Sequence, residues 1–163
     1  MNIRVIDFDI LTRNFQHYAD GYLKIESKKR EILTQIEPIK NEMNSIIKSA
    51  SSGLIMDEMT KRTNEERFRT LQEKLMSIDQ EAKKTLKEMQ EELTESTFQK
   101  LSEIVTDWSK ENSIDLVMGK MEVIFSSEAV DATDDILQII KDKGLQYVPE
   151  EPTVVGEAIQ PQS

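Results

Sequence analysis

The sequence predicts an α+β protein: a long antiparallel α-helical hairpin, forming a coiled-coil arm, attached to a small β body that further copies of the chain complete. A heptad-like apolar pattern fills the middle of the chain, and short β-branched runs stand near both ends. Aromatic residues make up 6% of the 163 residues and charged residues 32%, which leaves little bulky material for a large spherical core. We therefore expect an elongated molecule.

The first element is a predicted strand at residues 3–10, where the run IRVIDFDI is short, apolar and β-branched. From Phe15 onward, apolar residues recur at alternating steps of three and four, which predicts a long helix with a coiled-coil seam. Pro38 lies inside this helix. Because proline lacks a backbone donor and clashes with the preceding turn, we expect a bend there.

The tip of the helical hairpin is predicted at residues 49–53, SASSG, where small and polar residues favour a turn. Gly53 and Pro38 are the expected hinge positions of the arm. The apolar seam resumes at Leu71 and continues to Trp108, so the second helix is expected to run for about 50 residues, or about 75 Å. Two antiparallel helices of this length can bury their seams on each other.

The helical period ends near Asn112, and two apolar runs follow it. IDLVM at 114–118 and MEVIF at 121–125 flank the pair Gly119-Lys120, which predicts a β-hairpin. A short helix is expected next, capped by Asp131 or Thr133. The last stretch, residues 149–163, contains three prolines and several glutamates, which favour an acidic tail without fixed structure.

The expected domains are a β body of residues 1–16 and 112–148, an arm of residues 17–111, and the tail of residues 149–163. Three short strands and one small helix cannot enclose much core alone. The apolar residues of the body are therefore expected to meet those of other copies of the chain. These residues are Ile3, Val5, Ile114, Leu116, Val117, Val123, Ile124 and Phe125.

Composition excludes several classes of site and partner. The chain has no cysteine, one histidine and a formal net charge of −10, so disulfides and thiolate metal sites are excluded and broad binding to nucleic acid is not expected. It has no phosphate-cradling glycine loop, nucleophile elbow or zinc-helix motif, so we predict no enzyme activity, cofactor or metal. No apolar run reaches membrane-spanning length, and no leader-like run follows Met1. We expect a cytoplasmic location, or a periplasmic one if a signal peptide was removed.

One run carries a family resemblance. Residues 112–141, NSIDLVMGKMEVIFSSEAVDATDDILQIIK, and the opening run at residues 3–16 resemble the Skp/OmpH-like chaperones. The matching positions in the first run are Asp115, Leu116, Val117, Ser126, Ser127, Asp131, Thr133, Ile136 and Leu137. The resemblance implies a homotrimer with a shared β-barrel body, from which three helical hairpins hang as tentacles. It also implies that unfolded or partly folded client proteins are held between the tentacles without ATP.

This sequence departs from that family in its charge, because the family is usually basic. Residues 24–111 carry 16 basic and 18 acidic side chains, a net charge of −2, and the rest of the chain carries −8. Members of the family usually act on outer-membrane proteins in the periplasm, and the charge of this chain argues against the same clients.

Candidate client-binding residues lie at the tip and along the arm, because flexible methionine and aliphatic side chains can pack against varied partners. These residues are Leu54, Ile55, Met56, Met59, Met43 and Met76. The tip residues could instead only close the hairpin. An alternative function is a structural or assembly scaffold, for example of a virus or phage, that binds one defined partner through its arms. A prefoldin-like helper that passes clients to a second machine is a further alternative.

Overall fold

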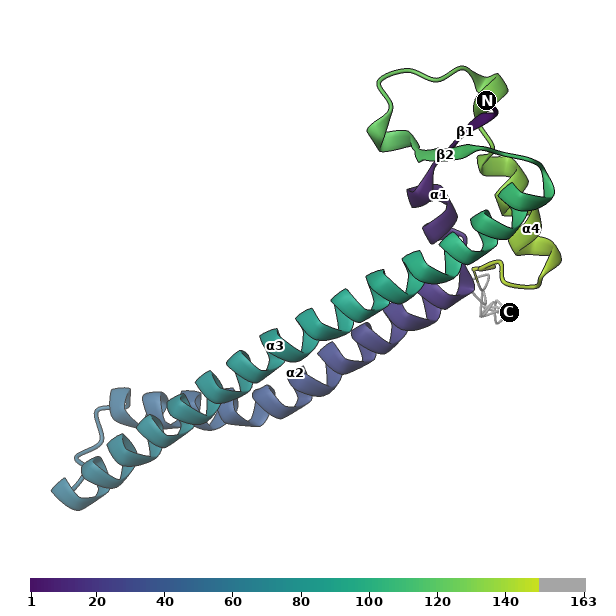
Figure 1. The fold of residues 1–163 in the computed structure, drawn as a ribbon. Coiled ribbons are helices and arrows are strands. Elements are labelled where there is room, and N and C mark those ends of the chain that lie inside the picture. The colour runs from purple at the N-terminus through teal and green to yellow at the C-terminus, as the bar shows by residue number, and fades with distance from the viewer. Residues whose placement is uncertain (150–163) are drawn as a thin grey trace, which may run out of the picture.

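A long helical hairpin projects from a small body in the computed structural model, which describes residues 1–149 (Figure 1). The hairpin consists of α2 (Gln16–Ser51) and α3 (Glu58–Glu111), which run antiparallel. The body consists of β1 (Ile3–Ile6), α1 (Phe8–Arg13), β2 (Leu116–Gly119), the 3-10 turns η1 (Lys120–Glu122) and η2 (Glu128–Val130), and α4 (Thr133–Asp142). The predicted α+β class with a helical hairpin is confirmed.

The predicted strand at residues 3–10 is too long, because the chain turns into a helix after Ile6. The Asp7 carboxylate accepts hydrogen bonds from the backbone N–H groups of Asp9 and Ile10, each at 3.1 Å, and so caps α1. An aspartate in this position satisfies backbone donors that the first helical turn leaves free. The short alternating run therefore contains a strand of four residues and the start of α1.

The predicted β-hairpin at 114–118 and 121–125 is wrong. β2 pairs in parallel with β1, with Ile3 opposite Leu116 and Ile6 opposite Gly119, so the whole helical hairpin connects the two strands. A two-residue hairpin turn needs positive φ at its central residues, whereas Gly119 is extended, with φ −69° and ψ 138°. The chain therefore continues into η1 instead of turning back, and residues 123–125 form no strand.

The body of a single chain has a larger core than the strands alone provide, because helices supply most of it. Leu11 from α1, Leu101 from α3, and Ile136 and Ile140 from α4 are fully buried. The cluster also includes Ile6, Phe15, Val105, Trp108 and Ala132. The end of α3 nearest the body is thus both part of the hairpin and part of the core of the body.

The two helices of the arm pack against each other through a narrow row of buried side chains. Ile25 and Ile39 on α2 and Leu71 and Leu93 on α3 are buried, with mostly exposed side chains around them. Pro38 lies inside α2, and Figure 1 shows that α2 changes direction between its first and second halves. Of the predicted acidic tail, residues 150–163 lie outside the described residues.

Candidate functional site

The tip of the hairpin is a short loop between two defined helix ends. α2 ends at Ser51, and Gly53 has φ +71°, a conformation that glycine adopts without strain. Asp57 caps α3, because its carboxylate accepts a hydrogen bond from the backbone N–H of Thr60 at 2.9 Å and one from the Thr60 hydroxyl at 2.8 Å. The Gly53 conformation and the Asp57 cap therefore mark the loop in which the chain reverses.

Apolar side chains stand in solvent at this tip. Leu54 is 76% exposed, Ile55 102% and Met59 81%. Met56 is half-buried, and its sulfur accepts a hydrogen bond from the Asn64 side chain at 3.7 Å. Exposed aliphatic groups gathered in this way are characteristic of surfaces that contact other molecules.

A groove of about 510 Å³ lies between the two helices next to the tip. Leu54 and Met56 line it, whereas Ile55 and Met59 lie outside it. The rest of its lining comes from the facing sides of α2 and α3, namely Ile46, Ile47, Ala50, Lys61, Asn64, Glu65, Phe68, Arg69 and Gln72. The lining combines aliphatic side chains and Phe68 with basic, acidic and amide groups, so the groove can accept a mainly apolar segment.

An ion pair joins the two helices near this groove. Arg67 on α3 donates two hydrogen bonds to the Glu42 carboxylate on α2, at 2.6 and 3.0 Å. The hydrogen bonds that Arg67 donates lower the pKa of Glu42 and so favour its ionised form. Both side chains are exposed, so the pair contributes little to stability.

The two other predicted methionines lie away from the tip groove. Met43 on α2 is half-buried and Met76 on α3 is exposed, and neither lines this groove. The structure therefore brings together Leu54 and Met56 and separates them from Met43 and Met76.

The body exposes a second apolar group, in the segment that follows β2. Met121 is 90% exposed, Ile124 107% and Phe125 83%. Of the other residues predicted for the body, Val5 is buried and Leu116 is 45% exposed, and the remaining four are half-buried, namely Ile3, Ile114, Val117 and Val123. Within residues 1–149 of a single chain, this segment therefore presents its side chains to water.

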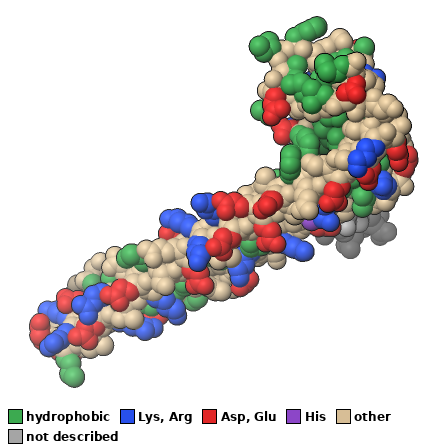
Figure 2. All heavy atoms as spheres, viewed as in Figure 1, with side chains coloured by type: hydrophobic (Ala, Val, Ile, Leu, Met, Phe, Trp, Pro, Cys, Tyr) green, Lys and Arg blue, Asp and Glu red, His purple; other side chains and the backbone are tan. Residues whose placement is uncertain are grey.

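A notch between the body and α3 is a third feature, which sequence reasoning missed. It has a volume of about 690 Å³, and Figure 2 shows hydrophobic side chains gathered where the body meets the hairpin. Phe8 and Phe98 stack in its lining, with ring centroids 5.2 Å apart. The available signal was Phe98 itself, an aromatic residue in the arm helix that lies outside the apolar seam.

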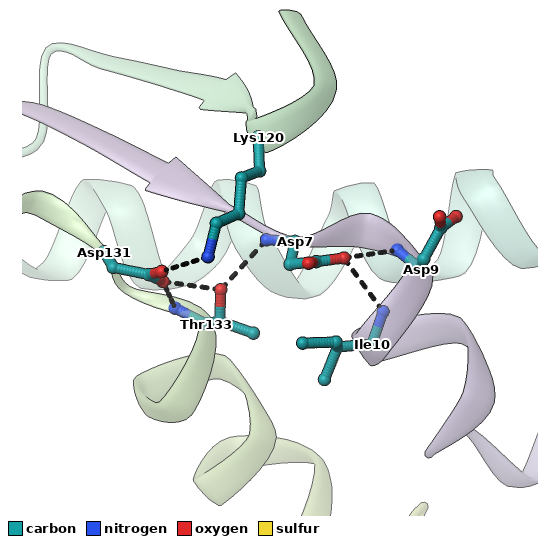
Figure 3. Close-up of polar contacts among 6 residues, drawn as sticks. All are labelled: Asp7, Asp9, Ile10, Lys120, Asp131 and Thr133. Atoms are coloured by element: carbon teal, nitrogen blue, oxygen red, sulfur yellow. Dashed lines mark hydrogen bonds and ion pairs between the residues drawn. The ribbon is translucent and has the colours of Figure 1, made fainter. Parts of the chain in front are cut away.

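A polar cluster holds the body side of this notch together (Figure 3). The Asp131 carboxylate accepts hydrogen bonds from the backbone N–H and the hydroxyl of Thr133, at 2.9 and 2.6 Å, and from Lys120 Nζ at 3.1 Å. The Thr133 hydroxyl oxygen in turn accepts a hydrogen bond from the Asp7 backbone N–H at 2.9 Å. The hydrogen bonds from Thr133, followed by the hydrogen bond and the positive charge of Lys120, lower the pKa of Asp131. The cluster connects η1, α4 and the start of α1.

The single histidine lies at the base of the arm. His17 Nε2 is 2.8 Å from the Ser96 hydroxyl across the hairpin, and burial followed by the charge of Lys100 lowers its pKa. Within residues 1–149, no three histidine, aspartate or glutamate side chains are grouped so that they could hold a metal ion. In the same part of the chain, every helix is too short or too polar to cross a membrane.

Comparison with known proteins agrees with this architecture. Residues 2–150 match the model of the OmpH family, described as outer membrane protein (OmpH-like). The fold is similar to the crystal structure of a candidate outer membrane chaperone, OmpH-like, from Caulobacter crescentus CB15. The TM-score is 0.67 at 10% identity, over 92% of this chain and 89% of that chain. No curated protein matches the sequence. Because the family match covers most of its length, the chain belongs to the OmpH-like family.

Proposed function

We propose that this protein is an ATP-independent holdase chaperone, which shields unfolded client proteins in a cavity between three arms of a homotrimer. Membership of the OmpH-like family supports a chaperone-type function in general. The shielding of clients and the trimer go beyond what membership alone supports, and they rest on the surfaces described above.

The observation that carries the proposal is the exposed apolar tip. Leu54, Ile55 and Met59 stand in solvent at the end of a long arm, where they add nothing to the core of the chain. Unfolded proteins expose apolar segments of varied shape, and flexible aliphatic side chains can pack against many such segments. Several weak contacts made by several arms hold a client more firmly than one arm can.

The trimer is supported by the exposed segment after β2. Leaving Ile124 and Phe125 in water is unfavourable, at about 25 cal/mol for each Å² of apolar surface. In a ring of three copies, the segment of each copy would pack against a different patch on the next copy. All three segments would then be covered. The arms would then project from the shared body and enclose a space.

The first experiment measures protection of denatured clients. The purified protein, without nucleotide, should suppress light scattering by several chemically denatured clients diluted into buffer. The variant Leu54→Ser/Ile55→Ser should lose most of this protection, because it removes apolar tip surface without touching the core. Leu23→Ser/Leu33→Ser is the matched control, since both leucines are exposed on α2 away from the tip. Failure to protect any client, or equal loss in the control, would contradict the proposal.

The second experiment measures the assembly. Multi-angle light scattering should give three copies at micromolar concentration, and Ile124→Ser/Phe125→Ser should shift the mass toward one copy. A wild-type monomer would overturn the trimer. A scaffold would instead form a fixed-stoichiometry complex with a folded partner and give no protection to denatured clients. The cytoplasmic location stays a prediction, which fractionation of the cells that make the protein would check.

A further inference from the structure

We infer that the notch between the body and α3, together with the adjoining face of α3, binds client segments that combine Lys or Arg with an aromatic or aliphatic side chain. This inference rests on the proposed holdase function and names the chemistry of the clients. It concerns a different surface from the tip, so the two can be tested separately.

The floor of the site is aromatic and accessible. Phe98 is 59% exposed, although its ring stacks on that of Phe8 at 5.2 Å and an interplanar angle of 28°. Val105, Val117 and Met118 continue the apolar lining of the notch. Phe98 also lines a shallow depression of about 740 Å³ on the adjoining face of the same stretch of α3, so one ring belongs to both hollows. An apolar side chain of a client can enter here without any rearrangement of the core.

The rim of the site is acidic. Asp9 and Glu122 line the notch, and three further carboxylates line the adjoining depression on α3, namely Glu95, Glu103 and Asp107. Within the described part of the chain, these five carboxylates form no ion pair.

Few cations balance these carboxylates. Lys110 lines both hollows, and Lys120 lines the notch. The ammonium group of Lys120 is already engaged, because it donates a hydrogen bond to Asp131 at 3.1 Å. The site therefore presents unpaired negative charge around an aromatic floor.

A cationic apolar segment satisfies both features. A Lys or Arg side chain can lie over the exposed face of Phe98 and be attracted by the ring, while the carboxylates around it attract the same charge. The formal net charge of −10 also raises the local concentration of cationic polypeptides near the protein. The same charge repels nucleic acid phosphates.

A second copy of this chain fits the site poorly. It carries the same charge of −10, and its exposed apolar segment has Glu122 within it and Glu128 just after it. Placing those glutamates beside Glu95 and Glu103 would bring like charges together. Charge complementarity therefore favours a cationic client over a neighbouring subunit at this surface.

The test uses three fluorescent peptides of equal length and the full chain. The first peptide alternates Lys with Phe and Leu, the second has Glu in place of Lys, and the third has Ser in place of Phe and Leu. Fluorescence anisotropy should give the tightest binding for the first, with affinity that falls as salt increases. Equal binding of the second peptide would overturn the inference, and so would equal binding of the third.

Variants of the site locate the binding. Glu95→Gln/Glu103→Gln/Asp107→Asn should weaken binding of the first peptide about tenfold, given typical values for exposed charge pairs. Phe98→Ala should weaken it as well, and most strongly at high salt, where the aromatic contact dominates.

The matched control is Glu37→Gln/Glu73→Gln/Glu92→Gln, which changes the net charge equally at exposed sites outside the notch. It should leave the peptide affinity within about twofold, and a drop equal to that of the site variant would overturn the inference. A change in the assembled mass of the site variant by light scattering would assign the notch to a subunit interface and also overturn it.

The two proposals fail in different ways. If the tip variant loses protection of denatured clients while the notch variants bind peptides normally, the inference fails and the holdase proposal stands. If the wild type binds the cationic peptide at the notch but protects no client, the holdase proposal fails and the binding site stands.

Discussion

The side chain of Leu93 on α3 occupies the space that a Cβ atom on Gly21 of α2 would need. All three of the nearest atoms to that position belong to Leu93, and Leu93 itself is buried. The two helices of the arm therefore approach each other closely near the body because one of them lacks a side chain. This contact lies where the arm joins the core, so it influences the direction in which the arm leaves the body.

Gly21→Ala should destabilise the protein. Alanine favours the helix over glycine by about 1 kcal/mol, but forcing a methyl group against a buried leucine costs about 1 to 3 kcal/mol. We expect a net loss of about 1 kcal/mol in the free energy of unfolding, measured by urea denaturation with circular dichroism. Ser27→Ala, at an exposed position of the same helix, should raise stability by a few tenths of a kcal/mol. A Gly21→Ala protein more stable than the wild type would contradict this account.

The sequence could predict the arm because a heptad pattern is a local and repeated property. The apolar seam indicated both helices, and the small residues at 49–53 indicated the tip, although α2 continues to Ser51 and the loop follows at residues 52–57. The sequence could not show that the two helices approach each other closely at Gly21. A glycine in a helical pattern looks the same in the sequence whether or not a neighbouring side chain fills the space beside it. That information depends on the register of α2 against α3.

The body was harder to predict for a related reason. An alternating apolar run indicates a strand but does not name its partner, and the partner of Leu116 is Ile3, at the other end of the hairpin. The notch was missed because Phe8 and Phe98 are far apart in the sequence and meet only once α1 lies against α3. The candidate tip residues were accessible to prediction because they are neighbours in the chain.

Ile136→Ala should strongly destabilise the body. Ile136 is fully buried in the core formed with Leu101 and Ile140, and removing its outer carbons leaves a cavity that costs about 2 to 5 kcal/mol. Trp108 is the only tryptophan and lies in the same core, so its fluorescence reports the unfolding of this region. Ile10→Ala, at a partly exposed position of α1, should cost less than half as much. Equal effects of the two substitutions would contradict the assigned core.

Asp131→Asn should remove part of the loss of stability in acid. The hydrogen bonds from Thr133 and Lys120 lower the folded-state pKa of Asp131 below its ordinary value of 3.8. The ionised carboxylate therefore stabilises the fold at and above pH 4, and this contribution is lost as the pH falls from about 3.8 through the lower folded-state pKa. At pH 7 the variant should be less stable by about 1 to 2 kcal/mol, and the difference should shrink toward pH 2. Thermal unfolding at several pH values measures this difference.

The control for this prediction is Asp135→Asn, since Asp135 is exposed in the first turn of α4 and accepts no hydrogen bond in the described part of the chain. It should change stability by less than Asp131→Asn at pH 7. A constant difference between the Asp131 variant and the wild type from pH 7 to pH 2 would show that the charge of Asp131 is not what stabilises the body.

Pro38→Ala should straighten and stiffen the arm. Proline at this position leaves the Thr34 carbonyl without its usual helical donor, and a proline inside a helix costs about 3 kcal/mol relative to alanine. Because the chain has no cysteine, spin labels can be attached at Ser52→Cys in the tip and Asp20→Cys near the base. Dilution with unlabelled protein isolates the distance within one chain. The variant should give a longer mean distance and a narrower distribution, whereas Glu37→Ala should leave both unchanged. If a hinge at Pro38 lets the arm adjust to clients of different size, the Pro38→Ala protein should protect small denatured clients as well as the wild type does, and large clients less well. A distance distribution equal to that of the wild type would contradict a hinge at this position.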